Sequence, residues 1–513
     1  MFPFTSLLNH NIGYAIYLDT VGLLYLHYFK IKTKMNKKIM SKIIFIVIVV
    51  TVYTHTQTNY PEINEQINLG NFTQAQSLIE NKLFDKNLSE LEKYDLKFQI
   101  ELMDRIRKDF RRTREEVMKD LKKYYPDLTD AMMQNWEDDK SLEMKIIDGE
   151  KKYFNNSVAN LFRVNKDAKK HKADHEVIKS DNLDLFLESY IPRVVEAAKE
   201  SGERYLLPVK MKIKYTLTVK PNVVPHGEII RCWLPYPRES NLRQTEIKLL
   251  SINKNEYIIA DNKNLQRTIY LESKSEKDKP TKFEMDLNYM SKAEFVNLFD
   301  GIEDVTFNGN PEIFSEYTKE EFPHIVFSDR IRNLSTQIIG EEKDHVQMLK
   351  KIFTWVDINT PWASAREYST ISNIPEYALE NKHGDCGIQT LVFMTLCRYN
   401  GIPAKWQSGW MMHPAEINLH DWCEIYVDQY GWLPVDQSFG IKNYLDESNQ
   451  FFYLGGIDAY RLIVNDDYSK PLFPAKTYPR SETVDFQRGE VEWRGGNLYF
   501  DKWNYSMEVE YLE

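Results

Sequence analysis

The sequence predicts an α+β multidomain protein: a helical N-terminal region, then a small β-sandwich, then a segment that mixes helices and strands. At 513 residues and 42% hydrophobic content, the chain is long enough for two to four separately packed domains. Apolar residues recur every three or four positions in its first part and every second position after residue 208. Near residue 325 the helical spacing returns, and short aromatic-rich strands follow it.

The composition argues against several classes of function. The formal net charge of −10 and the isoelectric point near 5.7 argue against a nucleic-acid partner, because nucleic-acid binders present a basic face. Four cysteines are too few for a disulfide scaffold, and they contain no paired C-x-x-C spacing for zinc. We therefore expect no nucleic-acid partner, no metal site and no cofactor.

The first part of the chain predicts export. From Met35 the sequence carries a cluster of lysines, an apolar run from Ile43 to Val52, and small residues before Gln57. This is the pattern of a signal peptide, and the apolar run is short for a helix that spans a membrane. We expect residues 1–56 to be a leader, with translation starting at Met35 and a periplasmic or extracellular mature protein. An uncleaved leader that anchors the chain to the membrane is the alternative.

Residues 57–200 are predicted to form a helical domain. Their apolar residues keep a three-and-four spacing, as in Ile63, Ile67, Phe72, Ala75, Leu78, Ile79 and Leu83. The run from Arg105 to Glu116 is interpreted as a solvated helix face with i,i+4 ion pairs, and a site for an anionic partner is the alternative. The charged, apolar-poor stretch from Asn165 to Asn182 is predicted to be a linker or an exposed connection.

Residues 204–295 are predicted to form a small β-sandwich. Between Val209 and Val219 apolar residues alternate with Lys and Thr, and the same period of two returns in the segment KFEMDLNYM. Several short strands within about 90 residues are typical of a sandwich. Cys232 lies in phase with the apolar positions of its strand, so we interpret it as a small buried hydrophobe.

Residues 296–480 are predicted to form an α+β core, and residues 481–513 a hairpin and a strand packed on that core. Two helical segments, FSDRIRNLSTQIIG and KDHVQMLKKIFTWVDINT, open the core, and AKWQSGWMM, HDWCEIYV and GWLPVD follow as strands. Gly495-Gly496 marks the C-terminal hairpin, after which apolar residues alternate toward the end of the chain.

The stretch HGDCGIQTLVFMTLCRYNGIPAKW places Cys386 just before an apolar helical stripe. Gly401 is placed to end this helix, and Pro403 prevents its continuation. Cys386 therefore falls on the first turn, where unpaired backbone N–H groups and the helix dipole favour an anion. We expect its thiol to lose a proton more easily than a free thiol, which would make Cys386 a nucleophile. A buried packing role, usual for free cysteines, is the alternative.

A cysteine nucleophile needs a base, and the base needs an acceptor that orients it. His420 opens the strand HDWCEIYV, whose alternate residues face opposite sides, so that His420 and Asp421 point apart. Asp436 ends the next strand, and in an antiparallel pair joined by DQYG the strand start and the strand end lie together. We expect the imidazole Nδ1–H to donate to Asp436 while Nε2 faces the Cys386 thiol.

The other candidate residues are interpreted as structural. His413 is expected in a loop, and His383 on the surface of a turn. Cys397 and Cys423 are expected in the core, with a disulfide between them as an alternative in an exported protein. The Asp466-Asp467 pair lacks the oxygen-ligand spacing of a calcium loop.

The segments GDCGIQTLVFMTLCRYNGIPAKWQSGW, HDWCEIYV and GWLPVD resemble, in order, residue type and spacing, the core of the transglutaminase-like superfamily. The resemblance covers roughly residues 325–440, and RCWLPYPRES resembles the β-domain that often precedes this core in bacterial members. It implies a papain-like arrangement, in which the helix carrying the cysteine packs on an antiparallel sheet, and a catalytic triad of Cys386, His420 and Asp436. The helical N-terminal part is not covered.

The chemistry of this superfamily is acyl transfer. The resemblance implies that the Cys386 thiolate attacks a protein or peptide amide and that His420 protonates the leaving amine or ammonia. An amine or water would then take the thioester. Trp362 is the counterpart of a tryptophan that stabilises the oxyanion in animal members, and a packing role for Trp362 is the alternative. The resemblance does not choose among amine transfer, amidase and protease action.

Two other functions compete with acyl transfer. A catalytically inactive peptide-binding module on the same fold would be indicated by a missing triad residue, and none is missing. A metal-dependent hydrolase needs clustered ligands, and Cys386, His420 and Asp436 suit the roles of nucleophile, base and orienting acceptor better.

Overall fold

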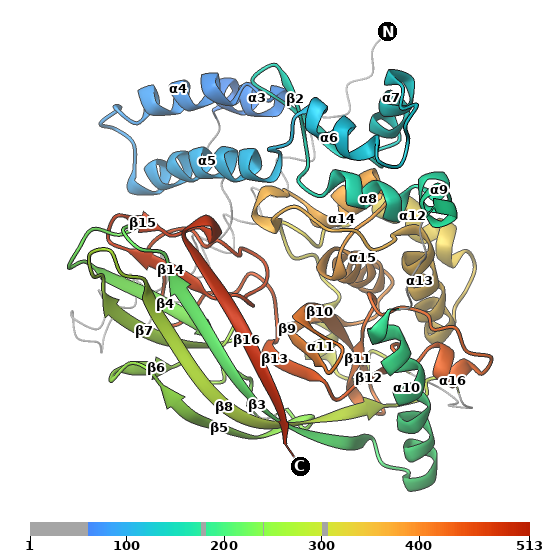
Figure 1. The fold of residues 1–513 in the computed structure, drawn as a ribbon. Helices are drawn as coiled ribbons and strands as arrows, with labels where there is room; N and C mark the ends of the chain where they lie inside the picture. Colours follow the sequence, from blue (N-terminus) through green and yellow to red (C-terminus); the bar gives the residue numbers. More distant parts are fainter. Residues whose placement is uncertain (1–59, 176–180, 240, 300–305, 513) are drawn as a thin grey trace, which may run out of the picture. The chain divides into compact units, whose positions relative to one another are not determined.

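The computed structural model describes residues 60–175, 181–239, 241–299 and 306–512 (Figure 1). The predicted leader, residues 1–56, and the start at Met35 lie outside the described residues. The described chain combines helices with antiparallel sheets, which confirms the predicted α+β class. Among the described helices, none combines the length and the apolar character needed to cross a bilayer.

Helices dominate residues 61–201, as their three-and-four spacing predicts. Ser89 and Thr113 begin two of these helices with capping boxes, in which the capping residue and the third helical residue satisfy each other's backbone N–H groups. The helices are α3 (Pro61–Leu69), α4 (Phe72–Lys82), α5 (Glu90–Asp109), α6 (Arg114–Leu121), α7 (Asp130–Asp138), α8 (Ser157–Val164), α9 (Lys166–His175) and α10 (Asn182–Ser201).

Two features of this region differ from the prediction. A hairpin of β1 (Met144–Ile147) and β2 (Glu150–Tyr153) interrupts the helices, and its turn residues Asp148 and Gly149 have φ values of 50° and 81°. An Asp-Gly turn with two positive φ values matches the twist of a tight hairpin. The stretch expected to be a linker begins with α9, whose buried Ala168 packs in the hydrophobic cluster formed with α6, α7 and α8, while most of its charged side chains stay exposed.

The β-sandwich draws strands from the middle and from the end of the chain. The C-terminal β14 pairs with β4 and β16 pairs with β3, so they extend both sheets (Figure 1). We expected these segments to pack on the core, but their backbone partners lie in the sandwich. Cys232 is fully buried there, as predicted. The strands are β3 (Tyr205–Val219), β4 (Ile229–Pro235), β5 (Gln244–Ile252), β6 (Tyr257–Ile259), β7 (Thr268–Lys274), β8 (Thr281–Phe295), β12 (Gly456–Ile457), β14 (Glu490–Trp493), β15 (Gly496–Asn497) and β16 (Trp503–Leu512).

A four-stranded antiparallel sheet of order β11-β10-β9-β13 forms the centre of the remaining part. Helix α15 contacts β9 and β10 of this sheet, and all its residues from Gly387 to Arg398 are buried. The strands are β9 (Ala404–His413), β10 (Glu416–Val427), β11 (Gly431–Val435) and β13 (Arg461–Asn465). The helices are α11 (Pro311–Tyr317), α12 (Asp329–Ile339), α13 (His345–Asn359), α14 (Ile374–Asn381), α15 (Cys386–Tyr399) and α16 (Glu447–Gln450), with the 3₁₀ turns η1 (Tyr368–Thr370) and η2 (Phe500–Lys502).

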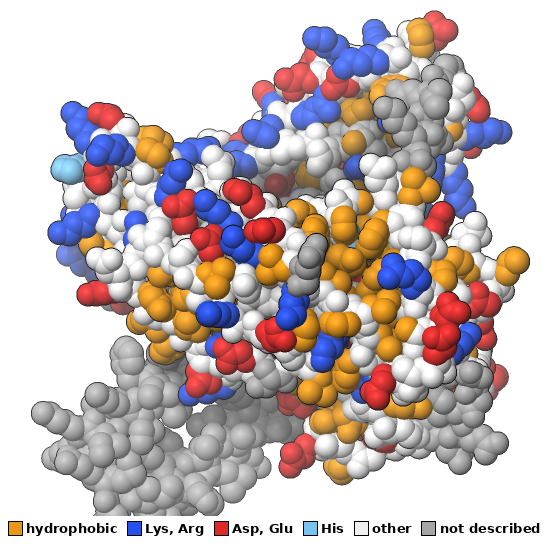
Figure 2. Space-filling model, turned by 60° about the horizontal axis from the view of Figure 1, so that its bottom comes forward, with side chains coloured by type: hydrophobic (Ala, Val, Ile, Leu, Met, Phe, Trp, Pro, Cys, Tyr) orange, Lys and Arg blue, Asp and Glu red, His pale blue; other side chains and the backbone are white. Residues whose placement is uncertain are grey.

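The described surface mixes polar and apolar areas. On the face shown in Figure 2, groups of hydrophobic side chains lie between side chains of both charge signs. Large apolar side chains with high exposure include Leu445, Phe84 and Phe322, which come from distant parts of the chain. Scattered apolar side chains of this kind are normal on a protein surface.

Candidate active site

Cys386 is the first residue of α15, as the sequence predicts. Asp385 caps the helix, and its side chain accepts a hydrogen bond of 3.2 Å from the Ile388 backbone N–H. The helix stops before Gly401, whose φ of 75° is the left-handed conformation that commonly ends a helix. Cys386 is only partly buried, whereas Cys232, Cys397 and Cys423 are fully buried, and all four thiols are free.

His420 lies where one edge of β10 is open. Strand β9 pairs with β10 from Glu416 to Ile425, but β11 pairs only with Cys423 to Val427. None of the described strands therefore pairs with the segment from His420 to Trp422 on the side of β11. Asp436 follows the last residue of β11, and its Oδ2 lies 2.8 Å from His420 Nε2. The predicted pairing of the histidine with the aspartate is thus present, at the place where the strand start and the strand end meet.

The ring nitrogen of His420 that contacts Asp436 differs from the predicted one. We expected Nδ1–H to donate to Asp436, but Nε2 makes this contact. The register of the two strands brings His420 and Asp436 together, but it does not fix the rotation of the imidazole ring. Among the described residues, no side chain or backbone group is hydrogen-bonded to His420 Nδ1, so Nδ1 is the nitrogen left for a reaction partner.

Asp436 belongs to a buried, charge-compensated network. Arg461 Nη2 lies 3.0 Å from Asp436 Oδ2 and 2.7 Å from Asp458 Oδ2, and all three side chains are fully enclosed. Burial alone would raise the pKa of Asp436, but His420 and Arg461 outweigh it and lower the pKa below its usual value. Burial lowers the pKa of His420, and the Asp436 carboxylate offsets only part of this effect. The pair therefore consists of a neutral imidazole beside an ionised carboxylate.

The Cys386 thiol contacts Asp421. Its Sγ lies 3.4 Å from Asp421 Oδ2, and the described residues show no hydrogen bond between this thiol and His420. Burial raises the pKa of the thiol well above its usual value, and the carboxyl groups of Asp421 and Asp385 raise it further. The expected ease of proton loss is therefore wrong for this conformation, because the prediction considered the helix start without the carboxyl groups around it.

Asp421 is held by side chains that the sequence analysis did not identify. Gln487 Nε2 donates to Asp421 Oδ1 at 2.6 Å, and the Tyr368 hydroxyl lies 2.6 Å from Asp385 Oδ1 and 3.5 Å from Asp421 Oδ2. Burial raises the pKa of Asp421 well above its usual value and that of Asp385 to about 6. No short motif joins Gln487 to this place, because it lies 66 residues from Asp421.

The predicted alternation along β10 is confirmed. Cys423 and Ile425 are buried in the cluster that contains α15, and Asp421 touches Cys386 on the same side. Trp422 instead packs with Ile457 and Ile463 in a separate small cluster. His420 and Asp421 are thus neighbours in the chain that serve two different sides of the strand.

The backbone of Trp362 pairs with the segment just before Cys386. Trp362 forms a parallel bridge with Gly384, and the Ala363 N–H donates to the Gly384 carbonyl at 3.0 Å. The indole is 44% exposed, and the guanidinium of Arg163 from α8 lies 4.8 Å from its centre. This position brings Trp362 to the segment that leads into α15, and its contribution to an oxyanion site stays a prediction.

Two histidines are more buried than predicted. His383, expected on a turn surface, is 1% exposed, and burial lowers its pKa to about 4. His413, expected in a loop, is the last residue of β9 and lies 2.9 Å from Asp458. Both errors have one cause, because polar residues at the ends of elements become enclosed when neighbouring segments cover them. Among the described residues, no group of three or more His, Cys, Asp or Glu side chains is arranged to share a metal ion.

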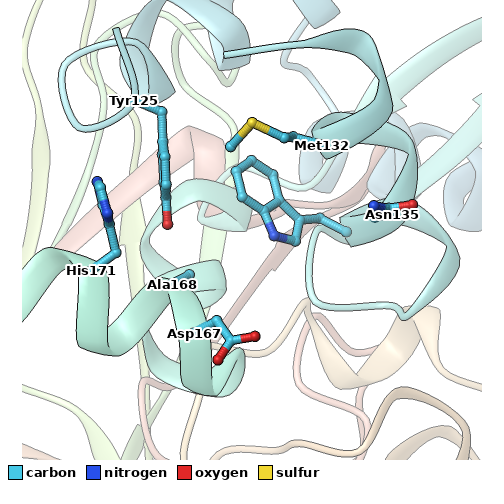
Figure 3. Close-up of a pocket in the computed structure, with 7 residues that line it drawn as sticks. Tyr125, Met132, Asn135, Asp167, Ala168 and His171 are labelled. Atoms are coloured by element: carbon cyan, nitrogen blue, oxygen red, sulfur yellow. The ribbon is translucent and has the colours of Figure 1, made fainter. Parts of the chain in front are cut away.

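A separate cavity of about 310 Å³ lies in the helical region. Figure 3 shows Tyr125 beside His171 and Met132, with Asp167 on the adjoining helix turn. The rings of Tyr125 and His171 stack with centroids 4.1 Å apart. None of the site residues predicted from the sequence lines this cavity.

One family model matches the part of the chain that contains α15, β9, β10 and β11. A model of the transglutaminase-like superfamily matches residues 332–437, which confirms the resemblance for this segment and the papain-like, transglutaminase-like core. The uncharacterized protein YebA of Bacillus subtilis (strain 168) is 20% identical over 133 residues. This match takes in 22% of the chain and 18% of YebA, so the chain spans only a small part of that relative's length.

Solved structures show similarity at low sequence identity. One is described as a candidate cysteine protease from Cytophaga hutchinsonii, with a TM-score of 0.40 and 14% identity over 60% of this chain and 92% of that chain. Another is the periplasmic domain of TgpA from Pseudomonas aeruginosa, with a TM-score of 0.24 and 10% identity over 46% of this chain and 93% of that chain.

Proposed function

Because residues 332–437 form a transglutaminase-like core, we propose that the protein is an exported enzyme that transfers acyl groups from protein or peptide amides through a thioester on Cys386. His420 is the proposed base and Asp436 the group that orients it. The observation that carries the proposal is the 2.8 Å contact between His420 Nε2 and Asp436, which pairs the proposed base with the group that orients it. Nucleophile, base and acceptor are the three parts that this chemistry needs.

The reaction begins with a proton transfer. The Cys386 thiol turns from Asp421 to His420 Nδ1 and gives its proton to that nitrogen. The sulfur then attacks the amide carbonyl, and the C–N bond breaks as Nδ1–H protonates the leaving amine or ammonia. Water or a second amine attacks the thioester, returns a proton to Nδ1 and releases the sulfur. Arg461 keeps the Asp436 carboxylate ionised, and this carboxylate stabilises the imidazolium that forms in each step.

Two donors are proposed for the oxyanion. The Cys386 backbone N–H is at the start of α15, where backbone N–H groups have no partner within the helix. The Trp362 indole N–H is the second, since the Trp362 backbone pairs with the segment just before Cys386. Donors aimed at a developing negative charge lower the barrier of acyl transfer.

A peptide-binding module without catalysis is a second candidate function. It is favoured by one observation, the hydrogen bond that Cys386 makes to Asp421 in place of His420. Such a module would bind peptides and leave their amide bonds intact.

Incubation of the purified protein with a glutamine-containing peptide, with and without a primary amine, tests the proposal. Ammonia with incorporated amine means a transferase, ammonia alone an amidase, and a shortened peptide a protease. Cys386→Ala should abolish all three, whereas Cys397→Ala, in the same helix, should retain activity. Product formation by Cys386→Ala would contradict the proposal, and binding without any product would favour the second candidate.

A further inference from the structure

We propose that Asp421 controls the nucleophile: it holds Cys386 as a protonated, resting thiol that must leave Asp421 before it reacts. The inference rests on the proposed function in that Cys386 is the nucleophile. Asp421 contacts the reacting sulfur directly, at 3.4 Å from Sγ to Oδ2. This assigns a specific task to a residue that the sequence analysis considered only as a group pointing away from His420.

The carboxyl group of Asp421 is fixed in position. Gln487 Nε2 donates to Asp421 Oδ1 at 2.6 Å and also to the His420 carbonyl at 2.8 Å. One amide group therefore ties the side chain of Asp421 to the backbone of its own strand. Asp421 and Gln487 are each 2% exposed, so the carboxyl group has little room to turn away from the sulfur. Any change of partner must come from the thiol.

Several acids surround Asp421, and no cation among the described residues forms an ion pair with Asp421 itself. The groups that face it are Asp385, which caps α15, Cys386 from α15, Tyr368 from η1, and Glu482 and Asp485 from the segment before β14. The guanidinium of Arg488, from the same segment, is held by Glu482 at 2.5 Å and by Glu367 at 2.7 Å. A thiolate next to these carboxyl groups is disfavoured, because like charges repel in a site with little water.

A hydrogen-bonded thiol is the favoured partner in such a place. The S–H bond donates to Asp421 Oδ2, and the sulfur carries no charge in this state. When the side chain turns, the same proton passes to His420 Nδ1, which has no hydrogen-bond partner among the described residues. One proton moves from sulfur to nitrogen, and no other reactant is needed. The protein therefore has a resting state with an S–H group and a reactive state with a thiolate–imidazolium pair.

The pH dependence of Cys386 alkylation by iodoacetamide, followed by peptide mass, tests this inference without any substrate. For the unmodified protein we expect a midpoint above about pH 8.5, the pKa of a free cysteine. Asp421→Asn keeps the shape and removes the carboxylate, so the midpoint should fall by about one pH unit and alkylation near pH 7 should become about tenfold faster. Asp344→Asn, the same change at the start of α13, should leave the midpoint unchanged.

Three results would overturn the inference. The first is a midpoint below about pH 7 in the unmodified protein, which would mean that Cys386 is already a thiolate at rest. This measurement does not depend on the folding of any variant. An unchanged or higher midpoint in Asp421→Asn shows that Asp421 does not hold the proton. A midpoint that rises in His420→Ala shows that His420 already stabilises the thiolate at rest. Because alkylation needs no acyl transfer, this test can be interpreted even if the peptide assay detects no product. An active enzyme in which Asp421→Asn leaves the alkylation midpoint unchanged would refute the role of Asp421 and leave the proposed function standing.

Discussion

The buried carboxyl groups in the two halves of the candidate site have pKa values shifted in opposite directions. On the His420 side, Asp436 and Asp458 share Arg461, and both carboxyl groups have lowered pKa values in spite of complete burial. On the Cys386 side, Asp421 has no cationic partner in the described part of the chain, and burial raises its pKa well above the usual value. The halves are joined through adjacent residues of one strand, His420 and Asp421.

The difference indicates a division of labour. An ionised carboxylate with fixed partners is suited to orient a base, because its charge does not change during the reaction. A carboxyl group whose pKa is raised by burial is suited to exchange hydrogen bonds with a thiol.

Asp436→Asn should lower kcat by about 10⁴-fold, because the amide neither stabilises the imidazolium nor selects the ring tautomer. The rate is measured with the peptide substrate found in the activity assay, and circular dichroism checks the fold. A kcat within about tenfold of the unmodified enzyme would remove Asp436 from the mechanism.

Arg461→Met should lower the free energy of unfolding by about 3–5 kcal/mol, because it leaves two carboxylates buried without their cation. Asp421→Asn should change the same quantity by less than about 1 kcal/mol, since Asp421 has no ion pair to lose. Urea unfolding measures both. Equal losses would mean that the two halves do not differ as described.

His383→Asn should make the protein less sensitive to acid. His383 is 1% exposed, and burial lowers its pKa to about 4. Between the unfolded pKa near 6.5 and the folded value, the unfolded chain binds the proton more readily, so stability is lost as the pH falls through this window. The variant should lose about 3 kcal/mol less of unfolding free energy across it. Identical pH profiles would show that His383 is protonated in the folded protein.

Trp362→Phe should lower kcat by about 10²-fold with a small change in KM, if the indole N–H stabilises the oxyanion. The phenyl ring keeps the packing against Arg163 and removes only the donor. An unchanged kcat would assign Trp362 to packing and would leave the Cys386 half with the backbone N–H alone.

Local patterns predicted the scaffold of the site. The apolar stripe after Cys386, with Gly401 beyond it, predicted α15 and its end, and the alternation in HDWCEIYV predicted which residues face the helix. The DQYG turn predicted that His420 and Asp436 meet. These features depend on neighbours in the chain, and a sequence displays such neighbours directly.

The electrostatics of the site could not be predicted in this way. Tyr368 and Gln487 reach Asp421 from segments 53 and 66 residues away, and no spacing rule connects them. The raised pKa of Cys386 and the lowered pKa of His383 both follow from burial by distant segments. The ring nitrogen that contacts Asp436 depends on a side-chain rotation, which a pattern of residue types does not encode.

The most direct test of acyl transfer is the mass of the intact protein after rapid acid quenching with a glutamine-containing peptide. If Cys386 is the nucleophile, we expect an adduct of the peptide mass less ammonia on Cys386 of the unmodified protein and no adduct on Cys386→Ala. Product that forms while Cys386 never carries an adduct, or an adduct on another residue, would contradict it.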